Sequence, residues 1–202
     1  MSQPPAAVGL PSQVIGAARR FAKDTYWTLR GAWLPAARPP VPPRHVLFVC
    51  HGNICRSPYA AVLASVLASR SAAPSIAWSS AGFAAAPGAP SPPEALAAAR
   101  RDGVALDAHR AIRLDAALVA AADLIVVFEV AHLIRLQAEY PAAATRFVLL
   151  PLLPARRARA FGYARYNIAD PFGQPGPVFD ACYARIRRDL AAFVAGLEAT
   201  DS

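Results

Sequence analysis

Residues 45–58 read HVLFVCHGNICRSP, and this stretch decides the fold. Its first part, Val46 to Val49, is a short apolar and β-branched run that is typical of a buried strand. A polar loop follows from Cys50, and the pattern predicts a helix over residues 57–70. A loop that leaves the carboxyl end of a parallel strand and opens a helix directs several backbone N–H groups at one point. The stretch therefore predicts a binding site for a phosphate-like anion.

Cys50 and Arg56 lie near the two ends of this loop and indicate nucleophilic chemistry on the bound anion. A thiol that is surrounded by N–H donors and lies near a guanidinium is stabilised as a thiolate, so Cys50 is the expected nucleophile. Arg56 is expected to bind two phosphoryl oxygens at once, and the Ser57 hydroxyl can donate to the sulfur as it leaves. Gly52 allows a close backbone approach or a positive φ, and Asn53 tolerates the left-handed region.

The spacing Cys-x5-Arg is weak evidence alone, because a buried cysteine ahead of a surface arginine would also produce it. The complete stretch from Val49 to Pro58 resembles the signature loop of the low-molecular-weight protein-tyrosine phosphatases. The resemblance extends to about Leu197. Its further segments are Ser80-Ala81-Gly82, Asp107-x-His109-Arg110, Ala122-Asp123-Leu124-Ile125 and Asp170-Pro171-Phe172-Gly173.

This resemblance implies hydrolysis of protein phosphotyrosine through a cysteinyl-phosphate, without a metal or a cofactor. It implies that Asp170 protonates the leaving oxygen and then activates water, which agrees with the need of a phenolate for a proton when it leaves. The implied catalytic residues are Cys50, Arg56 and Asp170. The implied phosphate-binding and substrate-binding residues are His51, Gly52, Asn53, Ile54, Cys55, Arg56, Ser57 and Phe172, and the implied loop supports are Asn53, Ser57, Ser80 and His109. The implied partner is a tyrosine-phosphorylated protein, for example a bacterial tyrosine kinase.

Alternating strand and helix patterns predict an α/β fold with a parallel sheet that is covered on both faces. Strands are expected at 46–49, 75–79, 124–128 and 146–150, and helices at 57–70, 93–103, 130–140 and 177–197. The apolar face of the last helix includes Cys182, which is expected in the core. The family's four-stranded parallel sheet with flanking helices agrees with this Rossmann-like, three-layer arrangement.

Residues 1–44 differ from the remainder and are expected to form a proline-rich, basic extension ahead of a phosphatase domain over 45–202. They hold six of the 21 basic residues but one of the 13 acidic residues, Asp24, whereas the whole chain carries a net charge of +8. A candidate amphipathic helix spans 12–34 and could lie on a membrane surface or pack on a partner. No nucleic acid is expected. Few cysteines and no apolar run of spanning length predict a cytoplasmic protein.

Several alternatives remain open on the same scaffold. Related protein-arginine phosphatases tend to carry threonine where this chain has Ile54, which favours tyrosine, whereas Phe172-Gly173 fits both groups. Arsenate reduction lacks its cysteine pair, because no cysteine lies between Cys55 and Cys182. A non-catalytic phosphotyrosine-binding adaptor is the remaining class.

Smaller hypotheses concern the pocket and single residues. A reversible Cys50–Cys55 disulfide is one of them. Alanines 84–86 predict a shallow pocket wall, with aromatic contact from Phe172 and also from His51 or Phe83. His45 and His132 have no evident partner in the sequence.

Overall fold

The computed structural model describes residues 21, 22, 24–26, 29, 43–70, 75–153 and 162–198. Within them, a four-stranded parallel sheet has the order β2-β1-β3-β4. Its strands are β1 (His45–Cys50), β2 (Ala77–Gly82), β3 (Leu124–Val127) and β4 (Phe147–Leu149). The chain moves from β1 to one side of the sheet and later returns through β3 to the other side. The carboxyl end of β1 therefore lies at a topological switch point, where such sheets bind ligands.

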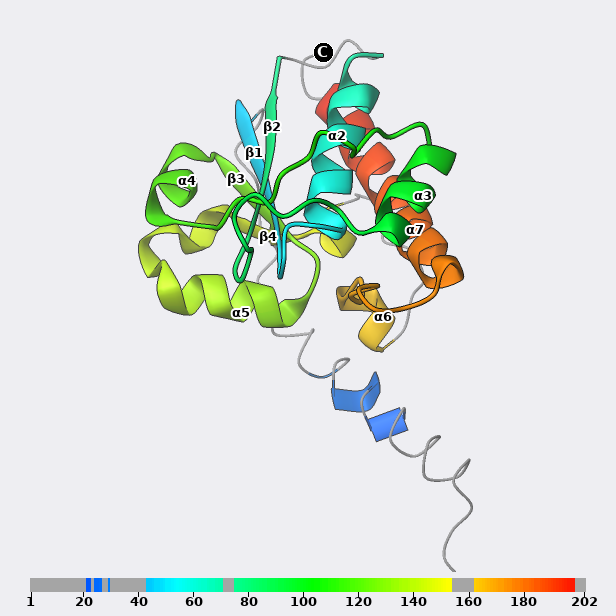
Figure 1. Cartoon of the computed structure of the whole chain (residues 1–202). Coiled ribbons are helices and arrows are strands. Elements are labelled where there is room, and N and C mark those ends of the chain that lie inside the picture. The colour runs from blue at the N-terminus through cyan, green and yellow to red at the C-terminus, as the bar shows by residue number, and fades with distance from the viewer. Residues whose placement is uncertain are drawn as a thin grey trace, which may run out of the picture.

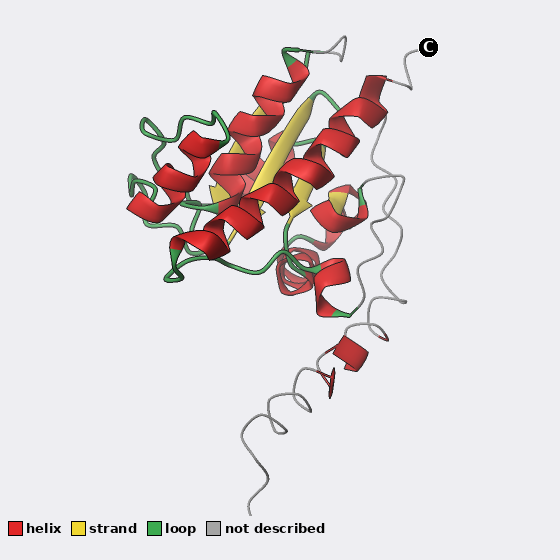
Figure 2. Ribbon diagram, turned by 90° about the vertical axis from the view of Figure 1, so that its right-hand side faces the viewer, coloured by secondary structure: helices red, strands yellow, loops and turns green. Residues whose placement is uncertain are grey.

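Helices cover both faces of the sheet, as Figures 1 and 2 show. The helices α2 (Arg56–Ala68), α3 (Pro93–Arg101) and α7 (Gly176–Glu198) pack on one face, and α4 (Ala116–Ala121) and α5 (Val130–Glu139) on the other. Side chains of β1 alternate between the two cores: Phe48 belongs to the first, and Leu47 and Val49 to the second. This alternation follows from the two-residue period of a strand, and it explains why the whole run is apolar.

The predicted elements are confirmed with shifts of a few residues at their ends, and short helices were missed. These are α4, α6 (Tyr163–Tyr166) and the 3-10 turns η1 (Pro141–Arg146) and η2 (Leu150–Leu152). Segments of three to six residues are too short to show a helical period. Of the helix expected over 12–34, residues 21, 22, 24–26 and 29 are helical, and the rest lies outside the described residues.

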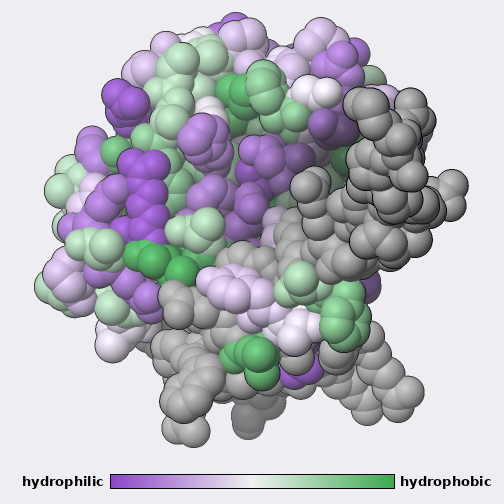
Figure 3. All heavy atoms as spheres, turned by 90° about the horizontal axis from the view of Figure 1, so that it is seen from below, coloured by the Kyte–Doolittle hydropathy of each residue, from purple (hydrophilic) through white to green (hydrophobic). Residues whose placement is uncertain are grey.

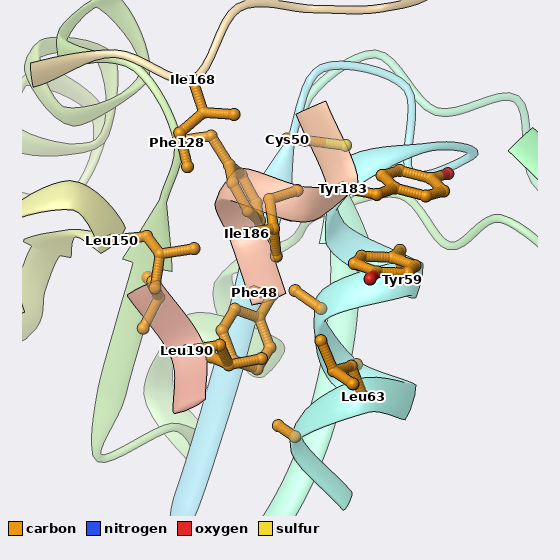
Figure 4. Packing of buried hydrophobic residues seen from close by; sticks show 14 of the residues in the cluster. Phe48, Cys50, Tyr59, Leu63, Phe128, Leu150, Ile168, Tyr183, Ile186 and Leu190 are labelled. Carbon is orange, nitrogen blue, oxygen red and sulfur yellow. The ribbon is translucent and has the colours of Figure 1, made fainter. Parts of the chain in front are cut away.

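The larger core supports the loop that follows β1. Tyr59 of α2 and Tyr183 of α7 stack with ring centroids 3.8 Å apart and planes 8° apart. The Tyr183 hydroxyl donates to the Cys55 carbonyl at 3.2 Å, so the stack is fastened to the loop. Figure 4 shows these rings near Cys50, and it shows Phe48 earlier on β1, the strand that Cys50 ends. Cys182 is buried in this core, as expected.

The beginning of β1 is held by a carboxylate and a histidine. Asp123 Oδ2 accepts from the backbone N–H groups of Arg44 at 2.8 Å and His45 at 2.9 Å. The His45 ring bonds the Ser79 hydroxyl at 2.7 Å and the Ala121 carbonyl at 3.1 Å. Both partners of His45 come from elements that are distant in the chain, so no sequence pattern indicated them. These contacts fix where β1 begins, and hence where its other end presents Cys50.

We predict that Asp123→Ala lowers the free energy of unfolding by about 1–2 kcal/mol, because two backbone donors lose their acceptor. The matched control is Asp107→Ala, which removes an exposed carboxylate paired with Arg100 and is expected to change stability by less than about 0.5 kcal/mol. Urea denaturation of both variants measures the difference. Equal stability of the two variants would contradict the role given to Asp123.

Candidate active site

Asn53 organises the loop between β1 and α2. It is fully buried and takes a φ of 54°, which makes it the left-handed residue of the loop. Its side-chain amide donates to the hydroxyls of Ser57 and Ser80, both at 2.9 Å. Its side-chain oxygen accepts from the Ile112 N–H at 2.7 Å. The loop is therefore tied to its own helix, to β2 and to the segment before α4.

His109 and Gly82 complete this support. The His109 ring nitrogen Nε2 lies 2.7 Å from the Asn53 carbonyl oxygen. A Cβ added at Gly82 would lie 2.6 Å from the Asn53 backbone nitrogen and 2.8 Å from the His51 carbonyl oxygen. The end of β2 thus packs against the loop backbone so closely that it leaves no room for a side chain.

Cys50 ends β1 and is almost inaccessible, with 2% of its surface exposed. Its sulfur accepts a hydrogen bond from the Asn53 N–H at 3.3 Å and lies 3.0 Å from the Ser57 hydroxyl oxygen. The Asn53 N–H donates to the sulfur, and the Ser57 hydroxyl proton can be directed either to the sulfur or to the Ala81 carbonyl, 3.2 Å away. The sequence-predicted residues Cys50, Asn53 and Ser57 are thus in mutual contact.

Arg56 is the first residue of α2, and only 1% of its side chain is exposed. Its Nη2 lies 2.6 Å from Asp170 Oδ2, and its Nη1 contacts Glu129 and donates to the Ile168 carbonyl at 3.0 Å. Burial alone would lower the pKa of Arg56, but the charges of Cys50, Asp170 and Glu129 outweigh it and raise the pKa. The guanidinium is therefore a permanent cation beside the Cys50 sulfur.

Glu129 is a site residue that sequence reasoning missed. It follows β3 directly, and its other oxygen accepts from the Tyr163 hydroxyl at 3.2 Å. The available signal was an acidic residue immediately after the apolar run 124–128. Because β1 and β3 are parallel neighbours, their carboxyl ends meet at one edge of the sheet, which brings Glu129 to the phosphate-binding loop.

The loop that carries Asp170 is fastened on its amino-terminal side. The Ile168 N–H donates to the Phe128 carbonyl at 2.7 Å, and Asn167 Oδ1 accepts from the Val130 N–H at 2.8 Å. Asp170 itself accepts from the Phe172 N–H at 3.2 Å. Its carboxylate is 39% exposed, so it can exchange protons with solvent while it faces Arg56.

A cavity of about 210 Å³ opens over the loop. Its lining residues are Cys50, His51, Gly52, Ile54, Cys55, Ala84, Ala86, Ala89, Asp170 and Phe172. One wall thus consists of alanines, and Phe172, which is 59% exposed, stands at the rim. Among the residues expected to bind substrate, Asn53, Arg56 and Ser57 are buried beneath the cavity.

Phe83 does not contribute to this cavity. Its ring is buried, lies 5.3 Å from the His132 ring, and is covered by the Arg135 guanidinium. The aromatic contact expected from Phe83 is therefore wrong, because the chain turns this side chain into the second core. His132, for which the sequence offered no partner, packs on that ring, and burial together with the nearby Arg56 charge lowers the pKa of His132 to about 4.

The other two cysteines differ from Cys50 in their surroundings. Burial raises the pKa of Cys55 well above that of an exposed thiol and raises the pKa of Cys182 to about 12. The Cys182 thiol faces the Ala169 carbonyl at 3.7 Å. Both are therefore neutral thiols at neutral pH and poor nucleophiles. Cys50 differs from both in that its sulfur accepts from a backbone N–H of the loop.

Comparison with known proteins decides the family. The model of the low molecular weight phosphotyrosine protein phosphatases matches residues 45–202. The chain belongs to this family, and it is a phosphatase. A probable low molecular weight protein-tyrosine-phosphatase, EpsP of Ralstonia nicotianae, is 32% identical over 154 residues, which cover 76% of this chain and 96% of that protein. Wzb of Salmonella typhi, a low molecular weight protein-tyrosine-phosphatase, is 29% identical over 158 residues, which cover 76% and 94%.

Solved structures agree with the fold of this phosphatase. The Wzb of Vibrio vulnificus in complex with benzylphosphonate has a TM-score of 0.65 and 28% identity, and the match covers 76% of this chain and 98% of that one. The YwlE arginine phosphatase from Geobacillus stearothermophilus has a TM-score of 0.68 and 26% identity, and the match covers 79% and 96%. The predicted α/β fold is therefore confirmed.

Two features are missing from the part of the chain that the structure describes. There, no cluster of histidine, cysteine and carboxylate side chains could hold a metal ion. In the same ranges, no helix is both long and apolar enough to cross a membrane.

We predict that Gly82→Ala impairs this site. The added methyl group would meet loop backbone, which cannot move aside as a flexible side chain can, so we expect a stability loss of about 1–3 kcal/mol and a lower kcat/KM. Gly176→Ala is the control, because a Cβ there meets nothing within 4 Å. Thermal unfolding and aryl phosphate turnover are the measurements, and normal values for Gly82→Ala would contradict the close approach.

Proposed function

We propose that this protein hydrolyses phosphotyrosine in proteins through a cysteinyl-phosphate intermediate. The observation that carries the proposal is that Cys50 and Asp170 line one cavity, beneath which the Arg56 guanidinium is buried. Arg56 pairs directly with Asp170, which comes from a distant segment of the chain, and it interacts electrostatically with Cys50 at the other end of its own loop. Transfer of a phosphoryl group from an aryl ester requires a nucleophile, a cation that binds the phosphoryl oxygens, and a proton donor.

In the first step, the Cys50 thiolate attacks phosphorus, and the bond from phosphorus to the phenolic oxygen breaks. Protonated Asp170 gives its proton to that oxygen, so tyrosine leaves as a neutral phenol. Arg56 and the N–H groups of the loop bind the phosphoryl oxygens. In the structure Arg56 pairs with carboxylates, and the incoming phosphoryl group would take over part of that pairing.

In the second step, ionised Asp170 accepts a proton from water. The water oxygen attacks phosphorus, and the bond from phosphorus to sulfur breaks. Inorganic phosphate forms, and the Cys50 thiolate is restored. The Ser57 hydroxyl, 3.0 Å from the sulfur, stabilises the leaving thiolate.

Protein phosphoarginine is the second candidate substrate, because the YwlE arginine phosphatase from Geobacillus stearothermophilus shares the fold. Two observations favour phosphotyrosine instead. Ile54 lines the cavity, where the arginine-specific relatives tend to carry threonine. EpsP and Wzb are both named protein-tyrosine-phosphatases. The physiological partner would then be a tyrosine-phosphorylated protein, and a bacterial tyrosine kinase fits that description.

The deciding measurement is phosphate release from an aryl phosphate and from phosphoarginine, side by side and in the presence of a chelator. We expect turnover of the aryl ester and its abolition in Cys50→Ser, because serine is a far weaker nucleophile at neutral pH. A preference for phosphoarginine would move the second candidate to first place. Retained phosphate binding with no turnover of either compound would favour a phosphotyrosine-binding adaptor.

We predict that the loss caused by Asp170→Asn depends on the leaving group. Asparagine cannot supply the proton, so kcat/KM for phenyl phosphate, which reports the first step and not the hydrolysis of the common cysteinyl-phosphate, is expected to fall by about 10²–10⁴-fold. The fall should be smaller for 4-nitrophenyl phosphate, because its phenolate leaves without help. Steady-state kinetics with both esters test this. Equal losses for the two esters would exclude Asp170 as the proton donor.

A further inference from the structure

Asp24, from the segment ahead of the phosphatase domain, contacts the domain close to the active site. Its carboxylate oxygen Oδ1 accepts a hydrogen bond from the Tyr163 backbone N–H at 2.9 Å, across 139 positions of sequence. Tyr163 begins α6, which precedes the loop that carries Asp170. In Figure 1 the described helical residues of 21–29 lie below α6.

Gly162 shows that the domain accommodates this carboxylate. A Cβ added at Gly162 would lie 2.5 Å from the Asp24 carboxyl carbon, and Gly162 itself takes a φ of +64°. Any other residue would therefore be strained and would also push Asp24 away. The hydrogen bond and the missing side chain are independent features of the same contact.

The charge pattern singles out the same residue. Asp24 is the only acidic residue among residues 1–44, which carry six basic residues. The sole carboxylate of a basic segment is thus the one that accepts from the domain. The family match begins at residue 45, and the match to EpsP covers 96% of that protein but 76% of this chain. The contact therefore adds a segment outside the shared domain.

From Tyr163 the contacts continue to the phosphate-binding arginine. The Tyr163 hydroxyl lies 3.2 Å from Glu129 Oε2, and the other oxygen of Glu129 pairs with Arg56. Asn167 also connects Tyr163 with the start of α5, next to Glu129. Its amide donates to the Tyr163 carbonyl at 3.0 Å, and its side-chain oxygen accepts from the Val130 N–H at 2.8 Å. Burial and the Glu129 charge raise the pKa of Tyr163 to about 12, so the hydroxyl keeps its proton at neutral pH and donates.

We propose that Asp24 and Tyr163 are positioning residues, through which the segment ahead of the domain holds Glu129 and thereby the Arg56 guanidinium in its phosphate-binding place. This inference rests on the phosphate-binding role proposed above for Arg56. Asp24 fixes the backbone of Tyr163, Tyr163 fixes one oxygen of Glu129, and Glu129 orients Arg56. A guanidinium that is already in place binds the phosphoryl group at a smaller entropic cost.

The described apolar side chains beside Asp24 are largely exposed, and the coloured part of the face in Figure 3 has no broad hydrophobic patch. Among its coloured atoms, hydrophobic residues form small separate patches between hydrophilic ones. Among the described residues beside Asp24, the large hydrophobic side chains of Phe21, Tyr26 and Leu29 are 75%, 54% and 65% exposed. Among the described residues of this segment, Asp24 makes a polar contact with the domain whose loss can be measured.

The test compares the full-length protein with Asp24→Ala, Asp24→Asn and Tyr163→Phe. The readouts are the Kd for inorganic phosphate by calorimetry and the exchange rate of the Tyr163 amide by NMR. We expect Asp24→Ala to speed that exchange and to weaken phosphate binding about three- to tenfold. Asp24→Asn should lie close to the unsubstituted protein, because the asparagine oxygen still accepts from Tyr163. Tyr163→Phe should weaken phosphate binding similarly.

Two controls separate coupling from general loss of structure. Asp115→Ala removes another carboxylate that accepts from the N–H of a short helix, namely Leu118 at 2.8 Å. It should speed exchange of the Leu118 amide and leave phosphate affinity unchanged. The double variant that carries Asp24→Ala and Tyr163→Phe should have the same Kd for phosphate as whichever single variant binds phosphate less tightly. Both substitutions act through Glu129, so their effects on the Kd should not add.

Unchanged Tyr163 exchange in Asp24→Ala would overturn the contact. Faster exchange with unchanged phosphate affinity, or equal weakening by Asp115→Ala, would overturn the coupling to Arg56. Additive losses in the double variant would also overturn it. Neither readout requires turnover, so this test stands or fails separately from the hydrolysis assays. The same variants in aryl phosphate kinetics should raise KM and leave kcat within about twofold.

Discussion

The structure of the site depends on the buried guanidinium of Arg56. A charge that is 1% exposed would destabilise the fold unless opposite charges and hydrogen-bond acceptors surrounded it. Three nearby segments supply them: Glu129 follows β3, the Ile168 carbonyl and Asp170 come from one loop, and the Cys50 sulfur ends β1. The need to compensate one cation thus gathers the groups to which the proposed phosphoryl transfer assigns roles. An arriving phosphoryl group meets a cation whose place is already fixed.

Asn53 orients the uncharged backbone groups of the loop, as Arg56 gathers the charged groups of the site. The left-handed backbone of Asn53 and its three side-chain hydrogen bonds fix the shape of the loop. Because the protein's own contacts orient the N–H groups, those groups lose little entropy on binding. One wall of the cavity consists of alanines, and the exposed Phe172 stands at its rim.

Sequence patterns predicted the sheet and the long helices because their periods extend over many residues. They missed α4 and α6, which have six and four residues, because so few positions show no period. The partners of His45 and the inward turn of Phe83 were also missed. In both cases the deciding neighbours, Ser79 and His132, lie far along the chain. The domain boundary at residue 45 remains a prediction, although the family match begins there.

The sequence by itself determined the phosphate-binding loop, because residues 50–57 are contiguous and their geometry follows from one strand, one turn and one helix. It also determined which face of each long element is apolar. Only the tertiary structure decided how Arg56 meets Glu129, 73 positions away, and how Tyr163 meets Asp24, 139 positions away. The physical reason is that hydrogen bonds and ion pairs act over a few ångströms. Folding alone decides which distant residues come within that range.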